Sequence, residues 1–234
     1  MKKVEDIFNR IICIYVFCER IFLEENNLEG IYFSSNDRED KRRVMIKWLN
    51  EKGYTNHLTN EEREIINTPV SSLDYTIRKK YNRYEAIEPL LWCLGLISRT
   101  SSYDKYVTTD FSRVLQIGAA HNIENLIKIS SLRSEQEIIN KREVSMLWNW
   151  RSKLRDLNDD IDKVIINIFG KEYKKHLKMK MSNSIPKDFI AFNEPYHKLS
   201  KDRVAQLEDI VEWRHHAYEW VLSDEDWDNV PISM

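Results

Sequence analysis

Apolar residues recur three and four positions apart along most of this chain, which is the spacing of one face of an α-helix. The pattern is clearest in the first helix, where Val4, Ile7, Ile11 and Tyr15 follow one another at that spacing. Intervals without the pattern are polar or contain proline, and we interpret them as connections. We expect helices over residues 4–24, 38–51, 73–97, 110–117, 122–129, 134–156, 160–181 and 200–222.

Local signals refine the boundaries of these helices. Thr59 with Glu62, and Ser134 with Glu137, have the spacing of a capping box, in which the two side chains bond each other's backbone N–H groups at a helix start. The first pair predicts a further short helix. Pro89 lies inside 73–97 and should kink that helix or divide it in two.

The number and type of these elements predict the fold class. The chain of 234 residues contains only 5 Gly and 5 Pro, and it shows no repeats and no convincing strand pairs. A chain of this length buries about 70% of its extended surface, enough for a core without disulfides or metal. We therefore expect an all-α fold with little or no sheet, a single-domain orthogonal multi-helix bundle over 1–234, in which 1–37 form an N-terminal helix and loop.

Charge and cysteine content limit the classes of partner. The net charge is −2, from 36 basic and 38 acidic side chains, so we expect no nucleic-acid partner, despite the lysine-rich stretch 171–180. No apolar run is long enough to span a bilayer, so we expect no membrane partner. The three cysteines lie in apolar stretches, without metal or redox spacing, which indicates buried free thiols and a cytoplasmic protein without cofactors.

Three of the expected helices carry charged residues on the face that their apolar residues define. Arg214 falls within the apolar arc of 200–222, and Arg151 and Glu143 fall within that of 134–156. Arg83 and Glu85 do the same on 73–97. Charged groups in such positions must be paired or must lie at the edge of the core.

Two interpretations of these five residues follow, and the sequence leaves both open. The first is a structural ion-pair network that orients the helices. The second is an arginine-lined pocket for a carboxylate or phosphate ligand, because three guanidinium groups face only two carboxylates. In an enzyme of this second kind, Glu85 or Glu143 would serve as proton acceptor.

Several stretches of the sequence resemble a known family. The stretch "YEAIEPLLWCLGLI" looks like the centre of the bacterial domain-of-unknown-function family numbered 4272. Trp148 and Arg151 match its Trp-x-x-Arg motif. The resemblance covers about residues 42–230 and implies an α-helical bacterial protein with no assigned activity. The matching stretches, in chain order, are "RRVMIKWL" (42–49), "HLTNEEREII" (57–66), "YEAIEPLLWCLGLI" (84–97) and "VEWRHHAYEWVLSDEDWDNV" (211–230).

The last of these stretches departs from the family pattern. The family tends to have Glu-Arg-x-Arg before its final Ala-x-x-Trp. Here Trp213 stands in place of the glutamate, Arg214 is kept, and His216 replaces the second arginine.

Two other groups of side chains give weaker evidence for a functional site. Glu208, Glu212, His215 and Glu219 fall on one face of 200–222, opposite the apolar arc, where we expect solvent and no metal. The acidic residues of 223–230 surround Trp227, which we expect to hold the tail against the body of the protein while the carboxylates stay hydrated.

The sequence contains no nucleophile elbow, no phosphate-binding loop and no dinucleotide fingerprint. We therefore expect a non-enzymatic interaction module that binds another protein. The alternative is a receptor or an enzyme for a small anion, which uses Arg83, Glu85, Glu143, Arg151 and Arg214. The sequence does not indicate the ligand or the oligomeric state.

Overall fold

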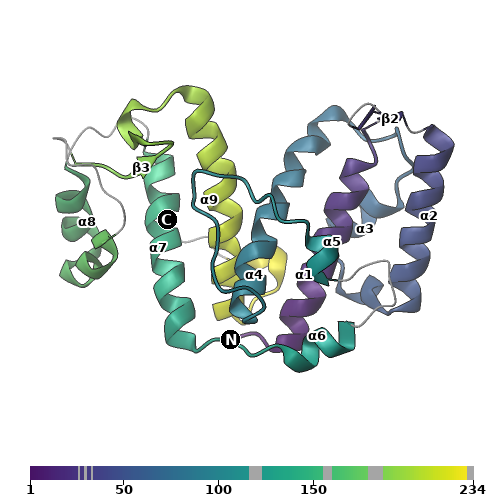
Figure 1. Cartoon of the computed structure of the whole chain (residues 1–234), viewed down its shortest axis with the longest axis horizontal. Coiled ribbons are helices and arrows are strands. Elements are labelled where there is room, and N and C mark those ends of the chain that lie inside the picture. The colour runs from purple at the N-terminus through teal and green to yellow at the C-terminus, as the bar shows by residue number, and fades with distance from the viewer. Residues whose placement is uncertain are drawn as a thin grey trace.

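Helices form almost all of the regular structure of the protein, shown in Figure 1 as a computed structural model. The structure describes residues 1–25, 27–28, 31–32, 34–115, 123–154, 160–178 and 187–230. The α-helices of these residues are α1 (Val4–Phe22), α2 (Ser35–Glu51), α3 (Asn60–Asn67), α4 (Ile87–Cys93), α5 (Phe111–Leu115), α6 (Ile123–Ile129), α7 (Glu135–Lys153), α8 (Ile161–Phe169) and α9 (Lys201–Leu222). The shorter-pitched 3₁₀ helices are η1 (Tyr54–His57), η2 (Tyr75–Ala86), η3 (Lys171–Lys178), η4 (Tyr196–Lys198) and η5 (Trp227–Asn229).

The all-α expectation is confirmed, with a small addition. Among the described residues, two ribbons of two-residue antiparallel strands occur in connections, β1 (Asn27–Leu28) with β2 (Ile31–Tyr32), and β3 (Ile190–Ala191) with β4 (Glu194–Pro195). The sequence pattern did not predict them, because strands this short carry no alternation of apolar and polar residues. Parts of the expected helices 110–117, 122–129, 134–156 and 160–181 lie outside the described residues.

The predicted helix starts at Thr59 and Ser134 are confirmed. In both, the hydroxyl accepts from the backbone N–H three residues on, and the glutamate there accepts from the backbone N–H of the cap. Pro89 also acts as expected, since the segment 73–97 divides into η2 and α4. Its ring blocks an α-helical bond to the carbonyl of Glu85, but it fits the first turn of α4, where backbone N–H groups have no partner within the helix.

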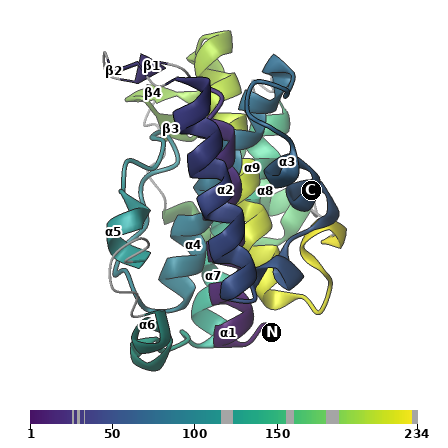
Figure 2. The same cartoon turned by 90° about the vertical axis from the view of Figure 1, so that its right-hand side faces the viewer.

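In the described part of the chain, the buried apolar residues form two clusters, and both include residues of α9. The larger cluster combines α1, which is buried along most of its length, with α4 and the C-terminal half of α9. The smaller cluster lies where α7, α8 and the β3–β4 ribbon meet the N-terminal half of α9. Figure 1 shows α9 between α7 and α4, and α2 forms an outer layer on the side that faces the viewer in Figure 2. The central place of α9 brings distant segments together.

The central position of α9 overturns one expectation. His215 is completely buried and Glu219 is mostly buried, so the face of Glu208, Glu212, His215 and Glu219 is not the solvated one that the apolar arc predicts. The reason is that α7 covers this face, with Arg142 on Glu219 and Lys153 on Glu212. Among the described residues, no group of His, Cys, Asp and Glu has the arrangement of a metal site.

Three further observations concern the ends and the thiols. Trp227 is buried, as expected for a residue that holds the tail against the body. Cys13, Cys18 and Cys93 are free and buried, and burial raises the pKa of Cys13 and Cys93 to about 12, which keeps both thiols protonated. Within the described part of the chain, no helix has the length and apolar character that a bilayer span requires.

Candidate functional site

The structure buries four of the five charged residues that the sequence singled out. Arg83, Glu85, Arg151 and Arg214 are each less than 10% exposed, and Glu143 is mostly buried. They do not form the single network that the first interpretation assumed. Glu143 and Arg151 are eight residues apart on α7, about 12 Å along the axis, and so face different neighbours. Arg83 and Glu85 point about 120° apart, because η2 has three residues per turn.

Arg214 and Glu85 form the one pair among the five that the structure brings together. Nε and Nη2 of Arg214 donate to Oε2 of Glu85 at 2.9 and 2.6 Å. The same guanidinium donates to the carbonyls of Ser101, Ser102 and Lys105. Because these acceptors surround the arginine, the pair fastens the connection after α4 to α9 and offers no group to a ligand.

The two charged residues of α7 have other partners. Arg151 donates to both oxygens of Asp188 at 3.0 and 2.9 Å, and the same carboxylate accepts from His197. Glu143 pairs with His176 at η3. Both contacts attach later segments to α7, and the sequence could not predict them because the partners lie 37 and 33 positions away along the chain.

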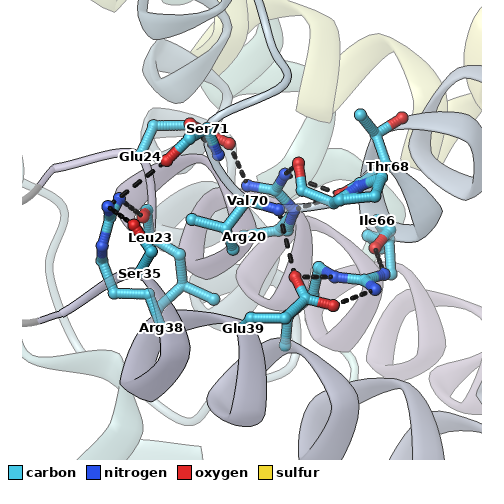
Figure 3. Close-up of polar contacts among 12 residues, drawn as sticks. Arg20, Leu23, Glu24, Ser35, Arg38, Glu39, Ile66, Thr68, Val70 and Ser71 are labelled. Carbon is cyan, nitrogen blue, oxygen red and sulfur yellow. Dashed lines mark hydrogen bonds and ion pairs between the residues drawn. The ribbon is translucent and has the colours of Figure 1, made fainter.

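A second group of buried arginines, which the sequence analysis missed, connects α1, α2 and the end of α3 (Figure 3). We call Arg20, Arg38, Arg42, Glu24 and Glu39 the arginine clasp. Its arginines donate to backbone carbonyls at helix ends, those of Leu23 after α1 and of Ile66, Asn67, Thr68 and Pro69 around the end of α3.

The arginine clasp is a structural device. The last carbonyls of a helix have no partner within it, and guanidinium groups satisfy them here. Glu24 accepts from Arg20 at 2.7 Å, and Glu39 accepts from Arg42 at 2.6 and 2.9 Å. These bonds to Arg42 lower the pKa of Glu39 to about 2. Figure 3 shows the side chains pointing toward one another between the helices.

Arg83 lies in a different environment, at the opposite end of α3. Its Nη2 pairs with Glu61, and its Nη1 lies 3.8 Å from Oε1 of Glu62. Glu62 pairs directly with Arg10 of α1. The Arg83 guanidinium also lies over the rings of Phe17 and Trp213, at 4.8 and 5.1 Å from their centroids. These contacts hold the side chain in one position.

Arg10 and Glu62 were not among the predicted site residues, although the sequence contained a signal for each. Arg10 stands on the apolar face of α1, three residues after Ile7 and four before Ile14. Glu62 was assigned only as a capping residue. Glu62 both caps α3 and pairs with Arg10, because Oε2 accepts from the backbone N–H of Thr59 at 3.0 Å while Oε1 pairs with Arg10. Although burial disfavours the charged form, the Glu62 carboxylate raises the pKa of Arg10.

Two cavities adjoin this group of residues. The larger has a volume of about 610 Å³ and lies between the start of α1, the segment 56–60 and the tail. Arg10, His57 and Trp220 are in its wall. The smaller has a volume of about 170 Å³, and Arg83, Glu212, Trp213 and His216 line it. Trp227 and Asp228 belong to the walls of both, so the tail separates the two cavities.

Several buried polar atoms of the residues that line these cavities have no hydrogen-bond partner among the described residues. They are Nε and Nη1 of Arg83, Nε of Arg10 and Nδ1 of His216. Nε2 of His216 lies 3.0 Å from the carbonyl of Trp227, which can only accept, so this nitrogen carries the proton. Burial lowers the pKa of His216 to about 4, which keeps the ring neutral and Nδ1 an acceptor at neutral pH.

We call Arg10, Glu61, Glu62, Arg83 and His216 the cavity cluster. Chemically it offers N–H donors and one imidazole acceptor to a bound group. The structure therefore places Arg83, one of the five predicted residues, at a cavity, whereas the described contacts of Glu85, Glu143, Arg151 and Arg214 are internal. Trp213 and His216, where this chain departs from the family pattern, line the smaller cavity.

Comparison with known proteins gives one match. Comparison with curated proteins finds no match, and neither does comparison with solved structures. The sequence profile of the family described as "Domain of unknown function (DUF4272)" matches residues 1–162. The match includes α1, which the motifs at 42–230 did not cover, and it ends before the motif at 211–230. Because it spans more than half of the 234 residues, the chain belongs to the DUF4272 family.

Proposed function

We propose that the protein is a non-catalytic binding module whose ligand is a small polar molecule held at the cavity cluster. One observation carries the proposal. Arg83 is more than nine-tenths buried, is fixed between two rings and two carboxylates, and still has two nitrogens without an acceptor among the described residues, while its side chain lines a cavity. A buried donor without a partner costs about 1–3 kcal/mol, which a ligand acceptor removes.

The size of the cavities supports a small molecule. The larger cavity, of about 610 Å³, is within the range of roughly 300–1,000 Å³ for sites of small ligands. A protein partner, expected from the sequence, requires an extensive contact surface. The exposed large apolar side chains of the described residues, such as Val44, Tyr75 and Ile168, are spread over separate elements.

The contacts of the two candidate proton acceptors support binding over catalysis. Glu85 accepts from Arg214 and from the backbone N–H of Val107, and Glu143 pairs with His176. Neither carboxylate lines the two cavities. A general base must reach the proton that it removes, so these residues do not supply one to a ligand at the cavity cluster.

The proposal extends to the setting of the protein. We place it in the bacterial cytoplasm, since its three free cysteines suit a reducing compartment and the family resemblance is to bacterial proteins. We also propose that residues 1–234 act as one domain. The support is that both apolar clusters include residues of α9, so neither is complete without that helix.

The indole N–H signals of the seven tryptophans, read by NMR, test the proposal. Trp213, Trp220 and Trp227 line the cavities, whereas Trp48, Trp92, Trp148 and Trp150 do not. The probes are acetamide, acetate, methylammonium, glycerol and inorganic phosphate. We expect at least one probe to shift the first group and leave the second unchanged. If no probe shifts Trp213, Trp220 or Trp227, the proposal is wrong.

A further inference from the structure

The charges around the two cavities do not favour a free anion. Arg83 and Arg10 are already matched by Glu61 and Glu62. The cavity walls add one further lysine, Lys2, and four more carboxylates, which are Asp6, Glu212, Asp226 and Asp228; of these, Glu212 is paired with Lys153 of α7. A phosphate or carboxylate ligand would lie beside these acids, and like charges at short distance in a partly buried site repel strongly.

A free cation is not favoured either. Two guanidinium groups are buried here, and their unpartnered atoms are donors, which an ammonium group cannot satisfy because it has only donors itself. The group that fits must accept from Arg83 and also donate to Nδ1 of His216. It must carry little net charge, because the cavity cluster already balances its own.

Resting on the proposed function, we infer that the smaller cavity binds an uncharged amide group. The amide carbonyl accepts from one of the two unpartnered nitrogens of Arg83, Nε or Nη1, whose N–H bonds point in different directions, and the amide N–H donates to Nδ1 of His216. An amide places both functions on one planar unit. At roughly 30 Å³ for each water in the liquid, a volume of about 170 Å³ has room for a primary amide and a few carbon atoms.

The surroundings of the two residues support a planar group. Trp213 and Trp227 are the aromatic residues of the cavity wall, and the His216 ring lies 5.6 and 4.3 Å from them, between centroids. Flat aromatic surfaces pack well against a flat amide. Asn9, Asn56, Asn60 and Asn229 line the larger cavity next to it, and each offers donors and an acceptor to further uncharged polar groups of the same ligand.

The decisive experiment compares acetamide with acetate, which have nearly the same shape and differ in charge. Both are titrated into the full chain at pH 7 while the indole signals of Trp213 and Trp227 are followed. We expect acetamide to bind with a Kd on the order of millimolar, since so few atoms limit affinity. We expect acetate to bind at least about tenfold more weakly, a difference of about 1.4 kcal/mol.

Variants test the two named contacts. Arg83→Met and His216→Leu should each remove acetamide binding, whereas His216→Gln should keep it, because a glutamine side chain again offers a donor to Trp227 and an acceptor to the ligand. Arg43→Met, on the exposed face of α2, is the matched control and should bind as the unchanged protein does. The acetamide–acetate comparison needs no variant, so it stands even if a substitution prevents folding.

The outcomes separate this inference from the proposed function. If acetate or phosphate binds more tightly than acetamide, the site is an anion receptor, and the amide inference is wrong while the proposed function stands. If acetamide binds but His216→Leu binds it equally well, the imidazole is not the acceptor and the inference is wrong. If none of the five probes shifts the three cavity tryptophans, both proposals are wrong.

Discussion

The buried arginines at the two ends of α1 and α3 meet different acceptors. At one end, Arg20, Arg38 and Arg42 of the arginine clasp find backbone carbonyls and two glutamates (Figure 3). At the other end, Arg10 and Arg83 of the cavity cluster find glutamates near the start of α3, and three of their nitrogens lack an acceptor among the described residues, against one, Nε of Arg38, in the arginine clasp. The arginines are similarly buried, so burial alone does not identify a binding site.

The polarity of α3 explains the difference. The end of a helix presents carbonyls without partners, and guanidinium groups with five donors can satisfy several at once. The start of a helix presents N–H groups, which require carboxylates, and Glu62 serves Thr59 and Arg10 together. An arginine near a helix start therefore finds few acceptors, and its remaining donors are available to something that is not part of the chain.

Arg20→Met should have the largest effect on stability, because it removes the centre of the arginine clasp and leaves the carbonyls of Thr68 and Pro69 without their donor. We expect a loss of about 3–5 kcal/mol in the free energy of unfolding, measured by denaturant titration. Arg43→Met, at an exposed arginine of α2, is the control and should change stability by less than about 0.5 kcal/mol. Equal effects would show that the arginine clasp contributes nothing.

Protonation of His216 should lower the stability of the folded protein in mild acid. Its pKa is about 4 in the folded protein and about 6.5 when exposed, so between these values the unfolded chain binds the proton first. Stability should therefore be full above pH 6.5 and fall by up to about 3 kcal/mol as the pH drops to 4. His216→Gln has no such proton, and its stability should change less over this range. If the stability of the two proteins changed with pH in the same way, this account would be contradicted.

Arg83→Met should cost less than Arg20→Met, even though both arginines are buried. Glu62 keeps Arg10, and Glu61 keeps Lys80, so neither carboxylate loses its last cation. We expect a loss of about 1–2 kcal/mol, chiefly from the contacts with Phe17 and Trp213. Denaturant titration of both variants under one condition makes the comparison. A loss as large as that of Arg20→Met would mean that Arg83 is a structural residue.

Glu39→Gln should have the smallest effect, confined to acid. The folded pKa of Glu39, about 2, lies below its ordinary value of 4.5, so its contribution is present above pH 4.5 and is lost as the pH falls toward 2. Since the pair with Arg42 is partly exposed, we expect a loss of at most about 1 kcal/mol at pH 7. The variant should lose less additional stability than the unchanged protein between pH 4.5 and 2, as followed by circular dichroism. If Glu39→Gln lost as much stability in acid as the unchanged protein does, the role given to Glu39 would be wrong.

Much of the fold was predictable from the sequence. The helix starts at Thr59 and Ser134, the division at Pro89 and the burial of Trp227 follow from local chemistry, and the structure confirms them. The solvated face predicted for His215 was wrong, because a helical wheel finds one apolar face and cannot show that a second helix covers the opposite one. The β3–β4 ribbon was likewise beyond local pattern.

The candidate site was predictable only in part. Arg83 was identified because it stands among apolar residues, and the same reasoning applied to α1 would have identified Arg10. His216 was noted only as a departure from the family pattern. The partners were not predictable, since Arg214 and Glu85 are 129 positions apart and Arg10 and Glu62 are 52 apart.

The sequence by itself determined where the helices form and which charged residues face the interior, because helical periodicity and capping depend on residues within one or two turns. Only the tertiary structure decided which acceptors each arginine meets. Those acceptors come from other helices, and their number depends on whether a helix start or a helix end lies opposite. That difference makes Arg20 part of a structural clasp and leaves donors of Arg83 without an acceptor among the described residues.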